Sequence, residues 1–167
     1  MIVRRYQQPI VNYIGRMVGE RELALDFSQE VFLKVYSSLR SYRPQFKFST
    51  WLFKIASNFI IDHWRKKKIP TLSIDQQAEG DDDCLQVQVP DDEPTVVRQY
   101  ELQELRAKID AAINRLPASL RELFVWRHIN GLSYEEMAEI KGQPLGTIKN
   151  RVFQAKERLK TLLEEQP

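Results

Sequence analysis

The chain of 167 residues is 43% apolar and 29% charged, the composition of a globular protein able to bury a core. No apolar run approaches the roughly 18 to 20 residues needed to span a bilayer, and the first residues lack the apolar centre of a signal peptide, so we expect a cytoplasmic protein without membrane insertion. The single cysteine, Cys84, excludes an intramolecular disulfide and a cysteine metal cluster.

The net charge of +2 conceals an uneven distribution along the sequence. Residues 1–70 hold 13 Lys or Arg against 5 Asp or Glu, whereas residues 71–100 hold 1 against 8. The basic part favours an anionic partner, with a charged and solvated surface as the alternative.

Three helices are predicted in the N-terminal part from the spacing of apolar residues. The first has one apolar face made of Ile10, Ile14, Met17 and Val18. The second runs from about Leu23 to Leu39, and its apolar residues Leu23, Phe27, Val31 and Val35 are spaced by four. The third runs from Trp51 to Lys67, and we expect Trp51 and Phe59 to be buried.

Residues 69–95 contain prolines, a glycine and an acidic cluster, and they show no sustained helical period. This composition is typical of a flexible acidic linker. We therefore predict an all-α chain with two small helical domains, 1–68 and 96–167, joined by the linker.

Helices are also predicted beyond the linker. The first spans Val97 to Leu116, with Leu102, Leu105, Ile109, Ala112, Ile113 and Leu116 facing inward. A second spans Leu120 to Ile129. The sequence SYEE at 133–136 is a capping box that begins a short helix, and Gly142 suits a left-handed helix end before a last helix that reaches about Glu164.

The last two helices form a predicted helix-turn-helix, whose second helix can enter the DNA major groove. Its inward stripe comprises Leu145, Ile148, Val152, Ala155, Leu159 and Leu162. Its outer face holds Thr147, Lys149, Asn150, Phe153 and Gln154, side chains suited to phosphates, base edges and a thymine methyl. The alternative is a plain helical hairpin in which Phe153 packs against the 97–116 helix.

The segment from 41 to 68 is rich in aromatic residues and ends in a cationic run. Its helix carries one polar strip, made of Lys54, Ser57, Asn58 and Arg65, beside a loop in which we expect Phe46 and Lys47 to be exposed. Such a surface resembles a platform for single-stranded nucleic acid. The alternative is that most of these aromatics belong to the core. No nucleophile motif, phosphate-binding glycine loop or metal-ligand cluster is present, so we expect no enzyme activity, metal or cofactor.

The two motif-bearing stretches, 26–68 and 116–163, resemble the promoter-melting and minus-35 domains of extracytoplasmic-function (ECF) sigma factors in the sigma-70 family. The resemblance implies a subunit that binds core RNA polymerase, directs it to promoter DNA through minus-10 and minus-35 contacts, and helps melt the duplex. It also implies regulation by an anti-sigma factor. Relatives usually begin earlier, so Met1 falls within what would be their first helix.

The resemblance assigns roles to particular residues. Asp26, Gln29 and Glu30 match a segment that docks on polymerase in the family. The loop from Tyr42 to Phe48 and the polar strip with Asn58 match the surface that reads a flipped minus-10 base, and the outer face of the last helix matches the minus-35 contacts. This chain has Pro44-Gln45-Phe46-Lys47 where many relatives carry a Gly-Asp or Gly-Glu loop, and Gln154 where some carry Arg.

A linker of 27 residues spans about 29 Å as a coil and about 90 Å when extended. Two major-groove sites two turns apart are separated by about 70 Å, so we expect polymerase to hold the domains apart. The competing classes are a helix-turn-helix regulator that binds duplex DNA alone and a helical adaptor that binds only proteins.

Overall fold

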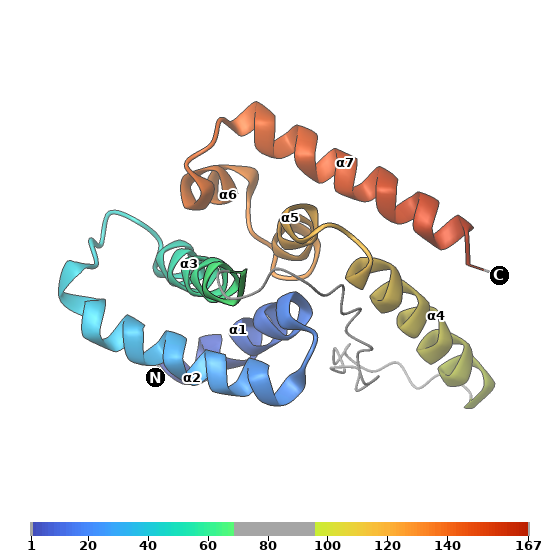
Figure 1. Ribbon diagram of the computed structural model, residues 1–167, viewed down its shortest axis with the longest axis horizontal. Coiled ribbons are helices and arrows are strands. Elements are labelled where there is room, and N and C mark those ends of the chain that lie inside the picture. Colours follow the sequence, from blue (N-terminus) through green and yellow to red (C-terminus); the bar gives the residue numbers. More distant parts are fainter. Residues whose placement is uncertain (1, 69–95, 167) are drawn as a thin grey trace.

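The computed structural model describes residues 2–68 and 96–166, and all regular structure in these two ranges is helical, which confirms the all-α prediction (Figure 1). The predicted linker, with Cys84 and the acidic cluster, lies outside the described residues. The elements are α1 (Ile2–Val18), α2 (Arg21–Ser38), the short 3-10 helix η1 (Leu39–Ser41), α3 (Phe48–Lys68), α4 (Val96–Asn114), α5 (Ala118–His128), α6 (Tyr134–Lys141) and α7 (Leu145–Glu164).

Helices α1 to α3 form the first group, and α1 and α2 bury most of the apolar face that their spacing predicts. Ile10, Ile14 and Met17 of α1 are buried. Gly19 has φ of 77° in the turn to α2, a left-handed conformation that favours glycine. Trp51 and Phe59 are half-buried and pack against the core, so the prediction that they are buried is confirmed only in part.

Helices α4 to α7 form the second group, in which α5 packs along α7. The inward stripe of α7 is buried as predicted at Ile148 and Val152, as it is further along the helix. The prediction is wrong for Leu102 and Leu105 of α4, which are 39% and 52% exposed. Figure 1 shows why: the N-terminal part of α4 runs outward from the other helices, and only its C-terminal end reaches the core.

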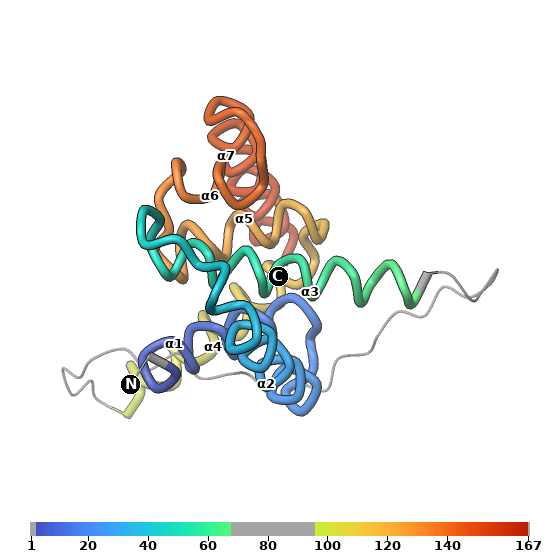
Figure 2. The backbone as a smooth tube through the Cα atoms, turned by 90° about the vertical axis from the view of Figure 1, so that its left-hand side faces the viewer, coloured from blue at the N-terminus to red at the C-terminus, as the bar shows by residue number. Residues whose placement is uncertain are grey.

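The two groups pack against each other, which the sequence did not predict. Helix α3 contacts α6, and α1 contacts α5, so that α3 lies between α2 and α6 (Figures 1 and 2). At this boundary the ring of Trp126 lies 5.6 Å from that of Tyr13 and 6.5 Å from that of Phe53. All three side chains are buried, and the apolar core is therefore continuous from one group to the other.

Candidate nucleic-acid interface

The turn between α6 and α7 is determined by local sequence. Ser133 Oγ accepts a hydrogen bond from the Glu136 N–H at 3.1 Å, and the Glu136 carboxylate accepts one from the Ser133 N–H at 2.8 Å, which confirms the capping box. Gly142 ends α6 with φ of 61°, the left-handed conformation predicted for it. Arg151 of α7 donates to Gln143 Oε1 at 3.2 Å and ties the helix to the turn.

The outer face of α7 is open to solvent. It comprises Thr147, Lys149, Asn150, Phe153 and Gln154, all of them exposed. Phe153 is 61% exposed, so the alternative in which it packs against the 97–116 helix is wrong. A large apolar ring among amide and ammonium groups gives this face the chemistry needed for a thymine methyl, base edges and phosphates.

Two residues outside α7 extend this face. The guanidinium carbon of Arg127 lies 4.4 Å from the ring centroid of Tyr134, and the Lys149 ammonium lies 5.8 Å from the same centroid. Arg127 also donates to the Leu132 carbonyl at 3.1 Å, which fixes its position. Sequence reasoning missed Arg127 and Tyr134 because only the folded hairpin brings them to Lys149.

Positive charge also surrounds His128, at the end of α5. Its pKa is lowered by partial burial of the ring, which lies 4.6 Å from the Phe124 ring, and by the nearby cations Arg127 and Lys156. The two cations beside this ring give a positive local potential, which suits an approaching phosphate backbone.

The loop before α3 is closed by one aromatic residue. The Tyr42 hydroxyl donates to the Phe46 carbonyl at 2.7 Å, and the Tyr42 ring lies 5.1 Å from that of Trp51. Phe46 is 45% exposed, as expected. Lys47 is also exposed, and its ammonium forms an ion pair with Glu136 of α6 at 3.1 Å. The loop therefore touches the helix-turn-helix.

The polar strip of α3 is only partly exposed. Lys54, Asn58 and Arg65 face solvent. Ser57 is 2% exposed, and its hydroxyl donates to Glu122 Oε1 of α5 at 2.7 Å. The expectation of one continuous exposed strip is wrong at Ser57, because α5 and α6 cover that side of α3.

The outer face of α2 combines acidic and apolar groups. Asp26, Gln29 and Glu30 are exposed, as a docking role requires. Leu33 and Tyr36 follow them along the helix and are 65% and 78% exposed. Exposed apolar side chains grouped with charged ones are typical of a protein-binding surface. Sequence reasoning missed these two residues, although their spacing from Asp26 and Gln29 repeats every seven.

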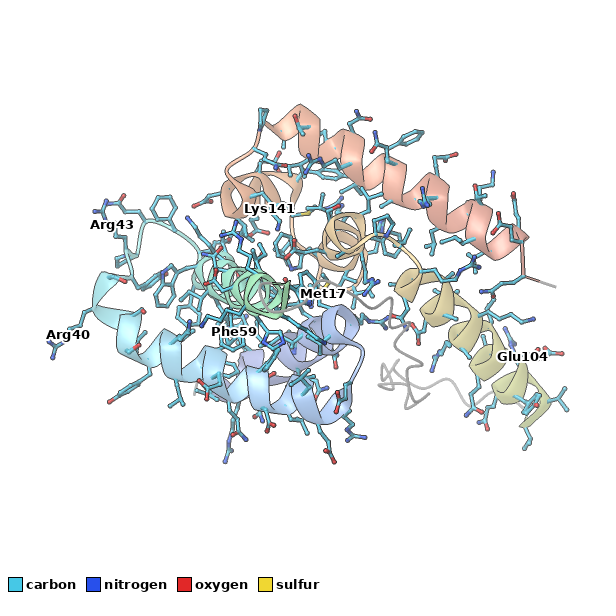
Figure 3. All side chains as sticks on the ribbon, viewed as in Figure 1. Met17, Arg40, Arg43, Phe59, Glu104 and Lys141 are labelled. Atoms are coloured by element: carbon cyan, nitrogen blue, oxygen red, sulfur yellow. The ribbon has the colours of Figure 1, made fainter. Side chains whose placement is uncertain are left out.

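A buried carboxylate lies where the two groups meet. Glu122 is 5% exposed, and its Oε1 accepts from the Tyr13 hydroxyl at 2.5 Å as well as from Ser57. Its Oε2 pairs with the ammonium of Lys141, the labelled α6 residue beside α3 in Figure 3. Burial, followed by the Glu122 carboxylate, raises the pKa of Tyr13 well above its ordinary value, so its hydroxyl remains a donor.

Residues 2–68 and 96–166 contain no group of three His, Cys, Asp or Glu side chains that is able to hold a metal ion. None of the helices described there is long and apolar enough to cross a membrane.

Two protein families match the two groups of helices. Residues 2–69 match Sigma-70 region 2, and residues 106–159 match Sigma-70 region 4. The chain is 34% identical to the ECF RNA polymerase sigma factor SigW of Bacillus subtilis, with 98% of the chain and 88% of that protein covered. It is 32% identical to the RNA polymerase sigma-H factor of Pseudomonas aeruginosa, with 98% and 85% covered.

The fold is also found among solved structures. The sigma factor RpoE of Bartonella quintana, solved in complex with the anti-sigma factor NepR, is 23% identical with a TM-score of 0.70 and covers 99% of this chain and 96% of its own. CnrH, solved with the cytosolic domain of CnrY, is 22% identical with a TM-score of 0.68 and covers 99% and 87%.

These matches define the class of protein as a bacterial transcription initiation factor. The chain belongs to the ECF group of the sigma-70 family. It is an RNA polymerase sigma factor, which directs the polymerase to promoters.

Proposed function

We propose that this sigma factor reads promoters through two separate surfaces, one in a domain of residues 1–68 and one in a domain of residues 96–167. The outer face of α7 meets the minus-35 duplex, and Arg127 adds a cation beside it. The observation that carries this proposal is the exposure of Phe153, 61%, on the second helix of a helix-turn-helix. A solvated aromatic ring at this position is explained by a partner that covers it.

The minus-10 surface consists of the 42–47 loop and the exposed side of α3. Tyr42 holds the loop closed, so that Phe46 and Lys47 are presented beside the start of α3. The Asn58 amide has a donor and an acceptor and can pair with the edge of an unstacked base. Lys54 and Arg65 follow the strand as phosphate contacts. Each stacked base contributes roughly 1 to 3 kcal/mol, which offsets part of the cost of melting.

Core polymerase docks on the outer face of α2. Asp26, Gln29 and Glu30 supply charge-assisted hydrogen bonds, and Leu33 and Tyr36 supply apolar area that is removed from water. The protein carries out no bond chemistry of its own, requires no cofactor and works in the cytoplasm, where the polymerase is. Its binding free energy is used to place the polymerase and to separate strands.

An anti-sigma factor is a further proposed partner. Support comes from two solved proteins of the same fold, RpoE and CnrH, each in complex with a partner protein. If a protein that copurifies with the chain blocks the association of the chain with core polymerase, this proposal is supported. If no copurifying protein reduces the transcription that the chain supports with core polymerase, the proposal is contradicted.

Transcription in vitro from a random promoter library, with the purified chain and core polymerase, tests the proposal. We expect transcripts that start downstream of paired sequence elements and that depend on both proteins. A helix-turn-helix regulator acting alone would bind single duplex sites and yield no such transcripts. A protein-only adaptor would select no DNA sequence at all.

A further inference from the structure

A cleft of about 590 Å³ lies between the 5–12 stretch of α1, the start of α3 and the turn from α5 to α6. Its walls come from both groups of helices, and the buried core that the groups share fixes these walls relative to each other. The volume lies within the range of about 300 to 1,000 Å³ that is typical of sites for small organic molecules. The contacts proposed for polymerase and promoter DNA leave this cleft unexplained.

Positive charge gathers around the cleft. Arg5, Lys47 and Arg127 line it, and among the described residues of its lining Glu136 is the one carboxylate. Lys47 pairs with Glu136 at 3.1 Å, and Arg127 donates to the Leu132 carbonyl at 3.1 Å, so the start of the helix-turn-helix holds both cations. The Lys47 side chain is 76% exposed. Because such an exposed pair contributes little stability, a stronger anion can replace its carboxylate.

The third cation, Arg5, lines the cleft from α1. Its guanidinium carbon lies 5.7 Å from the ring centroid of Tyr6, and it has no carboxylate partner among residues 2–68 and 96–166. The side chain is exposed and therefore able to meet a ligand. A cation without a carboxylate partner, beside two further cations on the opposite wall, favours an anionic ligand.

The rest of the lining suits a flat ring with polar edges. Phe53 and Leu132 are 3% and 5% exposed, and they supply apolar contact area. Gln8 donates to Asn12 Oδ1 at 2.8 Å. This bond leaves the Gln8 oxygen and the Asn12 nitrogen without a hydrogen-bond partner among the described residues. An amide oxygen and an amide nitrogen are the pair that binds the edge of adenine.

We propose that this cleft is a binding site for a free nucleoside monophosphate such as AMP. The base lies on the apolar floor with its edge at the two amides of α1, and the phosphate lies among the three cations. Hydrogen bonds between ionised partners are shorter and stronger than those between neutral groups. The phosphate therefore supplies much of the affinity, and the base supplies the selectivity over inorganic phosphate.

Nucleotide binding also affects promoter binding, and this consequence rests on the proposed function. Lys47 belongs to the proposed minus-10 loop, and Arg127 lies beside the proposed minus-35 face, 4.4 Å from the Tyr134 ring centroid. A phosphate held by these two cations removes them from the DNA backbone. The chain with bound nucleotide should therefore bind promoter DNA more weakly.

Isothermal titration calorimetry of the full chain with AMP, adenosine and inorganic phosphate tests the site. We expect one AMP per chain, bound at least about tenfold more tightly than adenosine or phosphate, because AMP alone uses both the floor and the cations. Equal affinities for AMP and phosphate would overturn the base site, and no saturable binding at millimolar AMP would overturn the whole proposal. A single-stranded oligonucleotide that displaces AMP and binds more tightly would overturn the choice of a free nucleotide.

Arg5→Ala removes the cation that no proposed DNA contact uses. We expect AMP affinity to fall about tenfold and adenosine affinity to stay unchanged. Arg4→Ala is the matched control, because Arg4 is also exposed on α1 but does not line the cleft. Equal loss of AMP binding in both variants would show that AMP follows the general basic surface, and it would overturn the site.

Ser49→Phe tests the cleft itself, since Ser49 lines it at the start of α3 and the added ring fills part of its volume. We expect AMP binding to be lost in a chain whose circular dichroism is unchanged. If this variant unfolds, Asn12→Leu replaces it and should weaken AMP binding about tenfold without changing phosphate binding. A folded variant that still binds AMP with wild-type affinity would overturn the proposal.

Failure of the proposed function appears differently from failure of the nucleotide site. A chain that binds AMP but neither promoter DNA nor core polymerase would contradict the proposed function alone. Normal promoter-directed transcription without AMP binding would contradict the site alone. Where both hold, AMP should weaken binding of a minus-35 duplex to the wild-type chain more than to Arg5→Ala. Equal duplex binding with and without AMP would overturn the effect on promoters.

Discussion

The outer face of α7 and the polar strip of α3 are both predicted DNA contacts, but they differ in their exposure to solvent. All five predicted side chains on α7 are exposed. On α3, Ser57 is buried beneath α5, and the neighbouring Lys47 is paired with α6. Helical spacing places residues on one side of a helix, but a second part of the chain decides whether that side meets solvent.

The largest effect is expected at the α3 surface, with Asn58→Ala. Loss of one base-reading amide should reduce open-complex formation roughly fivefold to 150-fold, from about 1 to 3 kcal/mol of lost contact. Binding to core polymerase should be unchanged, because Asn58 is exposed and belongs to α3, outside the α2 residues proposed to contact polymerase. Permanganate reactivity of melted thymines and a polymerase-binding assay measure the two steps.

Asn114→Ala is the matched control for this change, since Asn114 is exposed at the end of α4 and outside both DNA surfaces. It should leave melting intact. Equal loss of polymerase binding in Asn58→Ala would mean that the residue does not act on the minus-10 strand.

Phe153→Ala tests the open face of α7. We expect minus-35 duplex affinity to fall roughly fivefold to tenfold through loss of a thymine methyl contact, with almost no change in the free energy of unfolding. Val152→Ala is the comparison, because Val152 is 3% exposed and its truncation should cost about 1 to 3 kcal/mol of stability. Fluorescence anisotropy measures the duplex affinity of each variant, and urea unfolding measures its stability. A destabilised Phe153→Ala chain would place the ring in a packed environment.

Lys149→Ala should reduce the salt dependence of DNA binding. If the ammonium meets a phosphate, the slope of log affinity against log salt concentration should fall in magnitude by about one unit. Arg158→Ala removes an exposed cation nine residues further along α7 and should leave the slope unchanged. Identical slopes in wild type and Lys149→Ala would exclude the phosphate contact.

The smallest effect is expected at Glu136, which joins the capping box to the 42–47 loop. Burial acts to raise its pKa, but the hydrogen bond from the Ser133 N–H and the Lys47 ammonium outweigh it, so the pKa lies below the ordinary value of 4.5. The stabilisation is therefore present above that value and is lost as pH falls through the folded-state pKa. Glu136→Gln should lower Tm by about 2 to 4 °C near neutral pH.

The difference in Tm between wild type and Glu136→Gln should shrink as pH drops below about 4.5. Thermal melts of both proteins between pH 3 and pH 7 measure it. A difference that stays constant over this range would mean that the charge of Glu136 contributes nothing to folding.

Much of the fold follows from local sequence. The helices were predicted within a few residues, because apolar spacing and caps such as Ser133 and Gly142 act over one or two turns. Ser57 and Tyr13 were not predicted to meet Glu122, because these pairs are 65 and 109 positions apart in the sequence. Leu102 was misplaced for a related reason: an apolar stripe indicates a packing face but not whether a partner helix extends along all of it.

Nuclease footprinting on a selected promoter, with the chain alone and with the chain bound to core polymerase, tests the central claim most directly. The account predicts two protected sites about 70 Å apart only when polymerase is present, because in the isolated chain the two groups of helices pack against each other. Simultaneous protection of both sites by the chain alone would contradict it, and so would a complex with polymerase that protects no sequence-specific site.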